Sequence, residues 1–324
     1  MSKKKIPVLK NEKVGHLIAL LFFAIVGYSL YVASINMNYI WKWNSVPQYF
    51  VYEEINEIEA KEDGILVLKD NQYFIKNNQN KDILIEDLNK NYKFDYVIGE
   101  NVYEGDLIAT YKEMKAGPIL KGLWVTLKIS FFAALVTISL AITVSMMKLS
   151  SYVFLRDIAT VYITIIRGTP LLVQIFLFYF IVANIFALDR FMAGFLSLGI
   201  FYGAYMAEVL RGAIQSIDKG QMEASLSLGM SHFQAMRTII LPQAIKRALP
   251  TLIGEIISLV KDSSLVSIIA ITDLTKVGRE IVANTFSPFE TWIVIALVYL
   301  SLTFTLSYIG SKLEKKMASQ GGMA

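Results

Sequence analysis

Long apolar stretches dominate the pattern of hydrophobic and polar positions along this chain. A helix needs about 20 apolar residues to cross the roughly 30 Å of bilayer hydrocarbon, and it satisfies its own backbone hydrogen bonds there. Five stretches close to this length contain no Asp, Glu, Lys or Arg: residues 14–41, 129–147, 168–188, 191–207 and 291–311. The pattern therefore predicts an all-α polytopic membrane protein.

The segment between the first two stretches follows a different pattern. Short apolar or β-branched runs are separated by turns rich in Asn, Asp and Lys, which is typical of β-strands. The runs cover residues 65–68, 73–75 and 83–85. We expect three domains: a cytoplasmic tail with an anchor helix (1–43), a β-rich domain (44–117) and a transmembrane domain of five helices (118–318).

Two phrases in the β-rich segment, IEAKEDGILVLK (58–69) and ENVYEGDLIATY (100–111), resemble the half-motifs of a biotinyl- or lipoyl-like barrel-sandwich hybrid. The segment has no counterpart of the Met-Lys-Met hairpin that receives biotin or lipoate, so a carrier role is not expected. A generic small β-domain is the alternative.

The first apolar stretch is interpreted as a retained anchor helix. It is too long for the core of a signal peptide and lacks a small-residue cleavage site. Trp41 and Trp43 at its far end resemble an interfacial aromatic belt.

Composition supports a membrane protein and excludes several kinds of site. Apolar residues make up 55% of the chain, charged residues 18%, and the mean hydropathy is +0.49. The absence of cysteine excludes disulfides, thiolate metal sites and cysteine nucleophiles. The two histidines, His16 and His232, stand alone at the start of an apolar run and on a polar loop, where such a residue is usually a plain polar side chain, so no metal site is expected.

Charge divides the chain in a way that predicts its topology. Residues 42–118 hold nine Lys and fifteen Asp or Glu, a net charge of −6, whereas the whole chain carries +4. Lys and Arg mark the cytoplasmic side of a membrane protein. Placing every basic cluster inside requires six crossings, with both termini cytoplasmic and residues 42–118 outside.

The polar loop after the fourth apolar stretch combines residues that suggest a docking element. Residues 223–242 read EASLSLGMSHFQAMRTIILP and include Glu223, Ala224, Ser225, Gly229, Ile239, Leu241 and Pro242. Glu223 begins a short helical run that Gly229 can end in a left-handed conformation, and Pro242 and Pro250 bracket the next turn. A separate motor could push such a helix as a rigid body. An ordinary amphipathic loop helix is the alternative.

This loop resembles the EAA loop at which the ATPase subunit docks on the permeases of bacterial ABC importers. From residue 117 to about residue 316, the chain resembles the permease subunit of polar amino-acid ABC importers of the histidine, glutamine and arginine type. The supporting phrases are IIRGTPLLVQ (165–174), GAYMAEVLRGAIQSIDKGQ (203–221), LPQAIKRALP (241–250) and KDSSLVSIIAITDL (261–274). Ser225 replaces a usual Ala, KDSSL replaces the commoner KDTSL, and the anchor and β-rich domain are additions to the family core.

The resemblance implies a type I, MetI-like transmembrane fold in the bacterial cytoplasmic (inner) membrane. It implies that a polar amino acid is translocated with three partners: an ABC ATPase subunit, an extracytoplasmic amino-acid-binding protein, and a second permease copy or a paralogue. The chain lacks the G-x-x-x-x-G-K-[ST] sequence of an ATP site. We therefore expect a non-enzymatic subunit with no cofactor of its own, surrounded by lipid and independent of nucleic acid.

Lys261, Asp262 and Ser263 are candidates for the translocation pathway. They follow an apolar run that begins near Leu249 and is only about half a bilayer long at 1.5 Å per residue, and a second short run comes after them. Charges between two half-length segments suggest a discontinuous helix that faces a cavity. A structural pair that helps to bend the helix is the alternative.

Two further charged positions are candidates at the cytoplasmic mouth. Arg167 is either an interfacial anchor or a substrate contact. Glu208 and Arg211 share one helix face, so they form either a local ion pair or a gate.

Two rival functions remain open at this point. An ion-coupled secondary transporter is disfavoured because the five long stretches contain no Asp or Glu that could relay protons. A membrane-anchored sensor or adhesin that acts through its external domain would not need five further spans.

Overall fold

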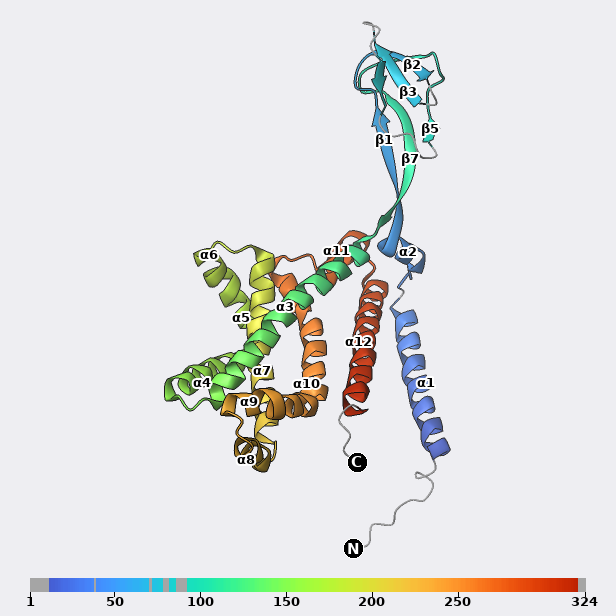
Figure 1. Ribbon diagram of the computed structural model, residues 1–324. Helices are drawn as coiled ribbons and strands as arrows, with labels where there is room; N and C mark the ends of the chain where they lie inside the picture. Colours follow the sequence, from blue (N-terminus) through green and yellow to red (C-terminus); the bar gives the residue numbers. More distant parts are fainter. Residues whose placement is uncertain (1–11, 38, 70–71, 78–81, 86–91, 320–324) are drawn as a thin grey trace. The chain divides into compact units, whose positions relative to one another are not determined.

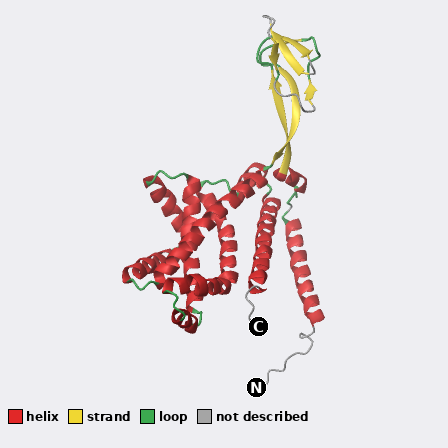
Figure 2. Cartoon of the chain, viewed as in Figure 1, coloured by secondary structure: helices red, strands yellow, loops and turns green. Residues whose placement is uncertain are grey.

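The computed structural model describes residues 12–37, 39–69, 72–77, 82–85 and 92–319 in two compact units (Figure 1). The first unit ends at Trp43 and the second begins at Asn44. Helices form most of the described chain, and the described strands all lie between α2 and α3 (Figure 2).

The first unit is built around helix α1 (Glu12–Asn36). Nothing within the described chain buries its most hydrophobic 18-residue window. A helix that is hydrophobic all round is typical of a membrane span. The helix ends at Asn36, before the apolar stretch does. Beyond it, Trp41 and Trp43 stack with their ring centroids 5.8 Å apart.

The second unit begins with the 3-10 turn η2 (Trp43–Ser45, shared with the end of the first unit) and the short helix α2 (Val46–Phe50), followed by the strands. The described strands are β1 (Val51–Glu59), β2 (Gly64–Lys69), β3 (Gln72–Asn77), β4 (Asp82–Leu84), β5 (Tyr92–Phe94), β6 (Asn101–Val102) and β7 (Leu107–Ala116). They form two antiparallel sheets with the orders β1-β7-β5 and β4-β3-β2-β6. Leu66, Ile75, Val102 and Ile108 are buried in their common core.

The strand region connects to the first long helix of the second unit at Gly117. β1 and β7 pair from Val51 with Ala116 onwards, so the two ends of the region meet. The Gly117 amide donates a hydrogen bond to the Phe50 carbonyl oxygen at 2.6 Å. A Cβ at Gly117 would lie 2.4 Å from the Tyr49 carbonyl oxygen, so this close approach requires glycine.

A series of helices follows Gly117. They are α3 (Pro118–Leu149), α4 (Val153–Arg167), α5 (Leu171–Leu177), the π-helical η3 (Phe178–Val182), α6 (Ala183–Ile185), α7 (Arg190–Gln215), α8 (Lys219–Ser227), α9 (His232–Ala235), the π-helical η4 (Met236–Ile240), α10 (Leu241–Asp262), the 3-10 helix η5 (Ser263–Ile269), α11 (Leu274–Thr285) and α12 (Pro288–Ser319).

The pair α4 and α5–α6 is bent by 108° at a short break. Pro170 occupies the N-cap position of α5. Gln174 holds the bend, because its side-chain amide donates to the Ile166 carbonyl oxygen and to Thr169 Oγ1, both at 2.7 Å. The amide nitrogen thereby pairs the Ile166 carbonyl oxygen, one of the carbonyls that the end of α4 leaves without a helical partner.

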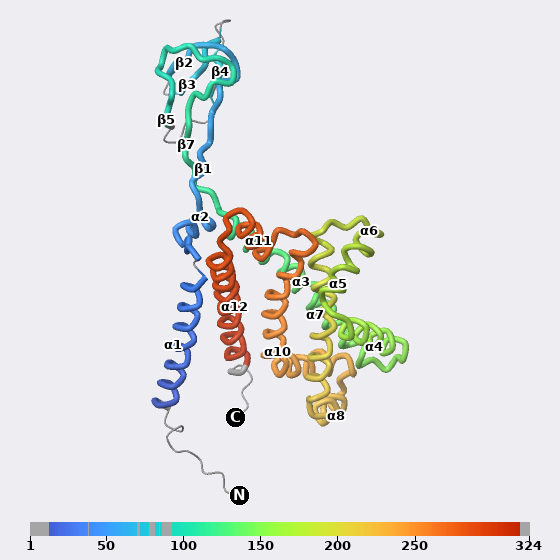
Figure 3. The backbone as a smooth tube through the Cα atoms, turned by 180° about the vertical axis from the view of Figure 1, so that it is seen from behind, coloured from blue at the N-terminus to red at the C-terminus, as the bar shows by residue number. Residues whose placement is uncertain are grey.

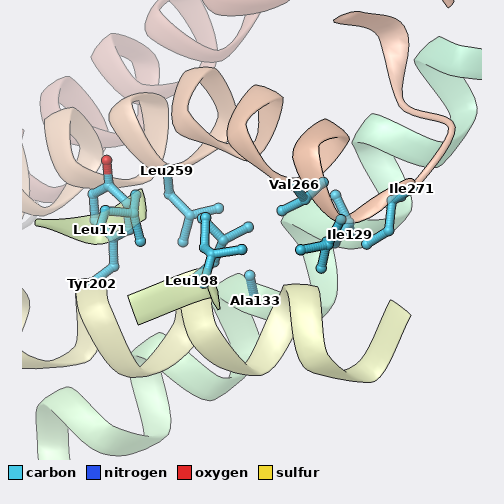
Figure 4. Close-up of a cluster of buried hydrophobic side chains, with 10 residues drawn as sticks. Ile129, Ala133, Leu171, Leu198, Tyr202, Leu259, Val266 and Ile271 are labelled. Carbon is cyan, nitrogen blue, oxygen red and sulfur yellow. The ribbon is translucent and has the colours of Figure 1, made fainter. Parts of the chain in front are cut away.

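Helix α7 packs closely on α3 through glycine. A Cβ at Gly199 would lie 2.6 Å from Val136 Cβ, and one at Gly203 would lie 2.8 Å from Leu140 Cβ. In lipid, helices associate through such close packing of small residues, because there is no hydrophobic force between them. A separate buried cluster joins both helices to α10 and η5, and it includes Ile129, Leu198, Leu259 and Val266 (Figure 4).

Four described helices are long and apolar enough to cross a membrane: α1, α3, α7 and α12. The bent pair makes a fifth if it counts as one span. Helix α10 is not among them, since it carries five charged residues: Lys246, Arg247, Glu255, Lys261 and Asp262. The six crossings expected from the sequence therefore stay a prediction.

The prediction that Pro242 and Pro250 bracket a turn is wrong. Both lie in α10. Pro242 stands in the first turn, where its missing N–H has no helical partner in any case. Pro250 is inside the helix, and packing on neighbouring helices outweighs the lost hydrogen bond that usually ends a helix at such a residue.

We predict that Gly199→Ala destabilises the protein and that Gly212→Ala, the same change on the same helix, does not. The added methyl at residue 199 would overlap Val136 and should cost about 1–3 kcal/mol. A Cβ at residue 212 meets no atom within 4 Å, so alanine there should stabilise α7 by about 0.5–1 kcal/mol. Thermal unfolding of the purified variants in detergent measures both effects. Equal unfolding midpoints would contradict the close packing of α3 and α7.

Candidate functional site

The loop between α7 and α10 begins with α8, whose two ends are both fixed by specific contacts. Asp218 caps the helix, and its Oδ1 accepts a hydrogen bond from the Gly220 amide at 2.7 Å. Gly229 follows the C-terminus with φ +82, and the Met230 amide reaches back to the Ser225 carbonyl oxygen at 3.2 Å. The predicted left-handed stop at Gly229 is confirmed, whereas the predicted start at Glu223 is wrong because Asp218 caps the helix earlier.

A second capped helix follows directly. Ser231 and Gln234 form a capping box at the start of α9, in which each side chain bonds the other residue's backbone amide. The chain then passes through η4 into α10. Ile239 and Leu241 are half-buried there, and Pro242 is exposed. The segment is therefore a helix–turn–helix with defined ends. It lies at the ends of α7 and α10 that are remote from α6 and α11 (Figure 3).

Apolar packing attaches this loop to the transmembrane helices. Met222 of α8 and Ile240 of η4 pack with Leu210 and Ile214 of α7 and with Ala244 of α10. Because these contacts come from both ends of the loop, α8 is seated on the helices that it connects.

The outer face of the loop combines one carboxylate with large apolar groups. Glu223 and Ala224 are exposed, whereas Ser225 is buried and donates to the Gln221 carbonyl oxygen at 2.6 Å. Leu228 is 84% exposed and Phe233 71% exposed. The sequence interpretation missed these two residues, although large apolar side chains in a polar loop were the available signal.

The candidate pathway residues lie on α4, α7 and α10, except Ser263, which begins η5. Glu208 and Arg211 form an ion pair with Oε2 and Nη2 2.8 Å apart. The Arg167 guanidinium lies over the Tyr205 ring, 5.0 Å from its centroid, and its charge acts on Glu208. Packing of α4 on α7 therefore brings Arg167 near Glu208, whereas Arg211 is the residue that forms the ion pair with Glu208.

Lys261 and Asp262 occupy different environments. The buried Tyr202 hydroxyl of α7 donates to Asp262 Oδ2 at 2.7 Å. Lys261 is exposed, and in the described part of the chain it forms no ion pair with Asp262. Ser263 is buried, and its hydroxyl donates to the Val260 carbonyl oxygen at 2.8 Å. The structure thus separates the two charges that the sequence interpretation treated as one pair.

Glu255 is a further acidic group that the sequence interpretation missed. It is half-buried on α10, and the charges of Arg167 and Asp262 both act on it. Glu255 precedes Asp262 by seven positions, so the two share a helix face. That spacing was the signal that could have revealed it. Arg167, Glu208, Glu255 and Asp262 therefore form a polar group contributed by three helices.

The described residues contain no group of three or more His, Asp or Glu that could hold a metal ion. The four side chains of the polar group supply one guanidinium and three carboxylates.

Tyr202→Phe should destabilise the protein, whereas Tyr205→Phe should not. The first change leaves the half-buried Asp262 without its donor, which should cost about 1–3 kcal/mol. The second keeps the ring that faces Arg167. Thermal unfolding in detergent provides the comparison. A Tyr202→Phe midpoint equal to that of the parent would show that the hydrogen bond does not fix the end of α10.

Comparison with known proteins gives this arrangement a family. The family model described as "Binding-protein-dependent transport system inner membrane component" matches residues 136–319. The chain is 36% identical over 203 residues to the arginine transport system permease protein ArtQ of Bacillus subtilis, covering 62% of this chain and 93% of the relative. It is 42% identical over 165 residues to the glutamine transport system permease protein GlnP of Escherichia coli K12, covering 50% and 75%.

Solved structures show the same fold for the helical part. A crystal structure of an amino acid ABC transporter with histidines aligns with a TM-score of 0.57 and 41% identity, covering 61% of this chain and 94% of that one. The MetNI methionine ABC transporter aligns with a TM-score of 0.54 and 16% identity, covering 61% and 95%, which supports the fold alone. Because the family model spans more than half of the chain, this protein belongs to the family of inner-membrane components of binding-protein-dependent transport systems.

Proposed function

We propose that this chain forms the membrane pathway of an ATP-driven importer of polar amino acids in the bacterial cytoplasmic membrane. The observation that carries the proposal is the capped helix–turn–helix between α7 and α10. Its exposed face presents Glu223, Leu228 and Phe233, and its buried face packs on both helices. An element built in this way can receive force from a partner protein and pass it to the helices behind it.

The class of substrate follows from the relatives and from the polar group. The named relatives are arginine and glutamine transport permeases, so we place a polar amino acid in the pathway. Its carboxylate and its ammonium group need protein charges of both signs. Arg167 supplies the positive one, and Glu255 and Asp262 supply negative ones. Glu208 is occupied by Arg211, which suits a gate position better than a substrate contact.

The partners follow from the family. We assign the α8–α9 loop to a separate ABC ATPase subunit, and the opposite side of the membrane to an amino-acid-binding protein. A second copy of this chain, or a paralogue, completes the pathway. We place the β-rich region outside the membrane as an insertion after the anchor helix, because residues 42–118 carry a net charge of −6.

Neither rival function gains support from the comparisons. An ion-coupled transporter would take up substrate without ATP, and a sensor that acts through its external region would not need the α8–α9 loop. ATP-dependent uptake by the reconstituted chain, its ATPase and its binding protein separates the leading proposal from both.

Gly229→Val should uncouple ATP hydrolysis from uptake, while Gly229→Asn should preserve coupling. The left-handed conformation costs a residue with a Cβ about 1–2 kcal/mol, so the end of α8 should shift in the valine variant and uptake per ATP should fall roughly tenfold. Asn tolerates this conformation better than most residues. A Cβ at residue 229 meets no atom within 4 Å, so the whole fold should survive both changes. Normal coupling in the valine variant would contradict the assignment of the α8–α9 loop to the ATPase.

Cysteine labelling tests the topology, and the absence of native cysteine gives a silent background. Cysteine at the exposed Lys61 should react with an impermeant maleimide in intact cells whose outer membrane, where present, has been opened. Cysteine at the exposed Ser227 should not react in those cells, and it should react only once the cytoplasmic membrane has also been permeabilised. The reverse pattern would overturn both the orientation and the position of the ATPase.

A further inference from the structure

Helices α7 and α10 are joined by hydrogen bonds at two separate levels. Tyr202 bonds to Asp262 at one level, and Ser216 bonds to Arg247 at the other. Tyr202 lies about 21 Å along α7 from Ser216, and Arg247 lies about 22 Å along α10 from Asp262, at 1.5 Å per residue. The two helices run antiparallel and the two lengths match, so the pair of bonds can hold them in one fixed register.

Arg247 makes the bond at the level of the docking loop. Its Nη1 donates to the Ser216 carbonyl oxygen at 2.5 Å and to Ser216 Oγ at 2.9 Å. Ser216 is the C-cap residue of α7, so its carbonyl is one of those that a helix leaves unpaired. A positive charge at a helix C-terminus is favourable as well. Arg247 thus caps α7 from a different helix.

The position of this bond is specific to the docking loop. The loop leaves α7 just after Ser216, and α8 begins at Lys219. The chain returns through η4 and enters α10 at Leu241. The Arg247–Ser216 bond closes the base of the loop and connects its first residues directly to α10. Without this bond, the first residues of the loop would be linked to α10 only through apolar contacts and through the backbone of the whole loop.

The chain route is the more compliant of the two. It includes the turn at Gly229 and the π-helical η4, a helix form that is uncommon and often marks functional sites. The apolar contacts at the base attach the loop to both helices but have no preferred direction. The hydrogen-bonded guanidinium fixes both distance and direction.

We propose that Arg247 is the positioning residue that couples movement of the docking loop to α10. The inference rests on the proposed function, since it assumes that a partner ATPase displaces α8. When α8 moves, Ser216 moves with it, and Arg247 carries this displacement to the helix that bears Glu255 and Asp262. Arg247 touches neither the substrate nor, in this assignment, the ATPase.

The test uses the full chain reconstituted with its ATPase and its binding protein. In Arg247→Ala, ATP hydrolysis and co-purification with the ATPase should remain close to the parent, and substrate transported per ATP should fall roughly fivefold. The factor is modest because Arg247 is exposed and water screens its charge. In Arg247→Lys, substrate transported per ATP should lie between the values of the parent and of Arg247→Ala, because lysine keeps the charge but not the planar guanidinium.

Two control variants separate the bond from the charge. Lys246→Ala removes the neighbouring exposed cation, for which the described residues include no ion-pair partner, and coupling should be unchanged. Ser216→Ala removes the hydroxyl acceptor but keeps the backbone carbonyl, so its effect should be much smaller than that of Arg247→Ala. Hydrogen exchange of the purified chain alone adds a measurement that needs no transport: amides at residues 212–218 should exchange faster in Arg247→Ala than in Lys246→Ala.

The outcomes separate this inference from the proposed function. Transport per ATP equal to the parent in Arg247→Ala would overturn the coupling role. Loss of co-purification with the ATPase in that variant would also overturn it, because Arg247 would then belong to the docking surface. If the parent shows no ATP-dependent uptake, the proposed function fails, and the coupling role fails with it. Faster exchange in Arg247→Ala would in that case still establish the bond as a structural contact of α7.

Discussion

Close approach of α7 to α3 is the constraint on which the other helix positions depend. In lipid there is no hydrophobic force between helices, so association relies on packing that brings two backbones together. Gly199 and Gly203 leave room for Val136 and Leu140 of α3, and the Thr137 hydroxyl donates to the Gly199 carbonyl oxygen at 3.3 Å. Once α7 is fixed in this way, its other faces position α4, α5 and α10 around it. The polar residues of the candidate pathway then converge from α7 itself and from α4 and α10, which both pack against it.

The sequence was sufficient where the deciding information is local. Apolar stretches revealed the long helices, because crossing a bilayer imposes a length and a composition on each segment alone. The left-handed stop at Gly229 was predictable for the same reason: a helix that ends on glycine is decided within a few residues. The basic flanks of the stretches and the acidic segment gave a topology that remains to be tested.

The sequence was insufficient where partners are distant along the chain. Pro250 suggested a turn, yet α10 continues through it because neighbouring helices hold the segment in place. Tyr202 and Asp262 are 60 positions apart, and nothing near either residue announces their bond. Gln174 lies within an apolar stretch, and its amide secures the bend between α4 and α5 through contacts that the stretch itself does not indicate. In each case a tertiary contact outweighs local preference, and a pattern along the chain carries no record of it.

Tertiary contacts also determine which carboxylates on α7 and α10 are already bonded within the fold and which can still accept a hydrogen bond. A carboxylate within a membrane protein is costly unless it finds a partner or a water-filled cavity. Glu208 is matched by Arg211, and Asp262 by the Tyr202 hydroxyl. Glu255 has no hydrogen bond or ion pair to another described residue, and it is half-buried within electrostatic range of Arg167. Its capacity to accept hydrogen bonds is thus open, whereas the capacities of Glu208 and Asp262 are partly used by the fold. We therefore expect Glu255, of the three acids, to gain most from the ammonium group of a passing amino acid. The hydrogen bonds at two levels between α7 and α10 hold the register of the helix that carries it.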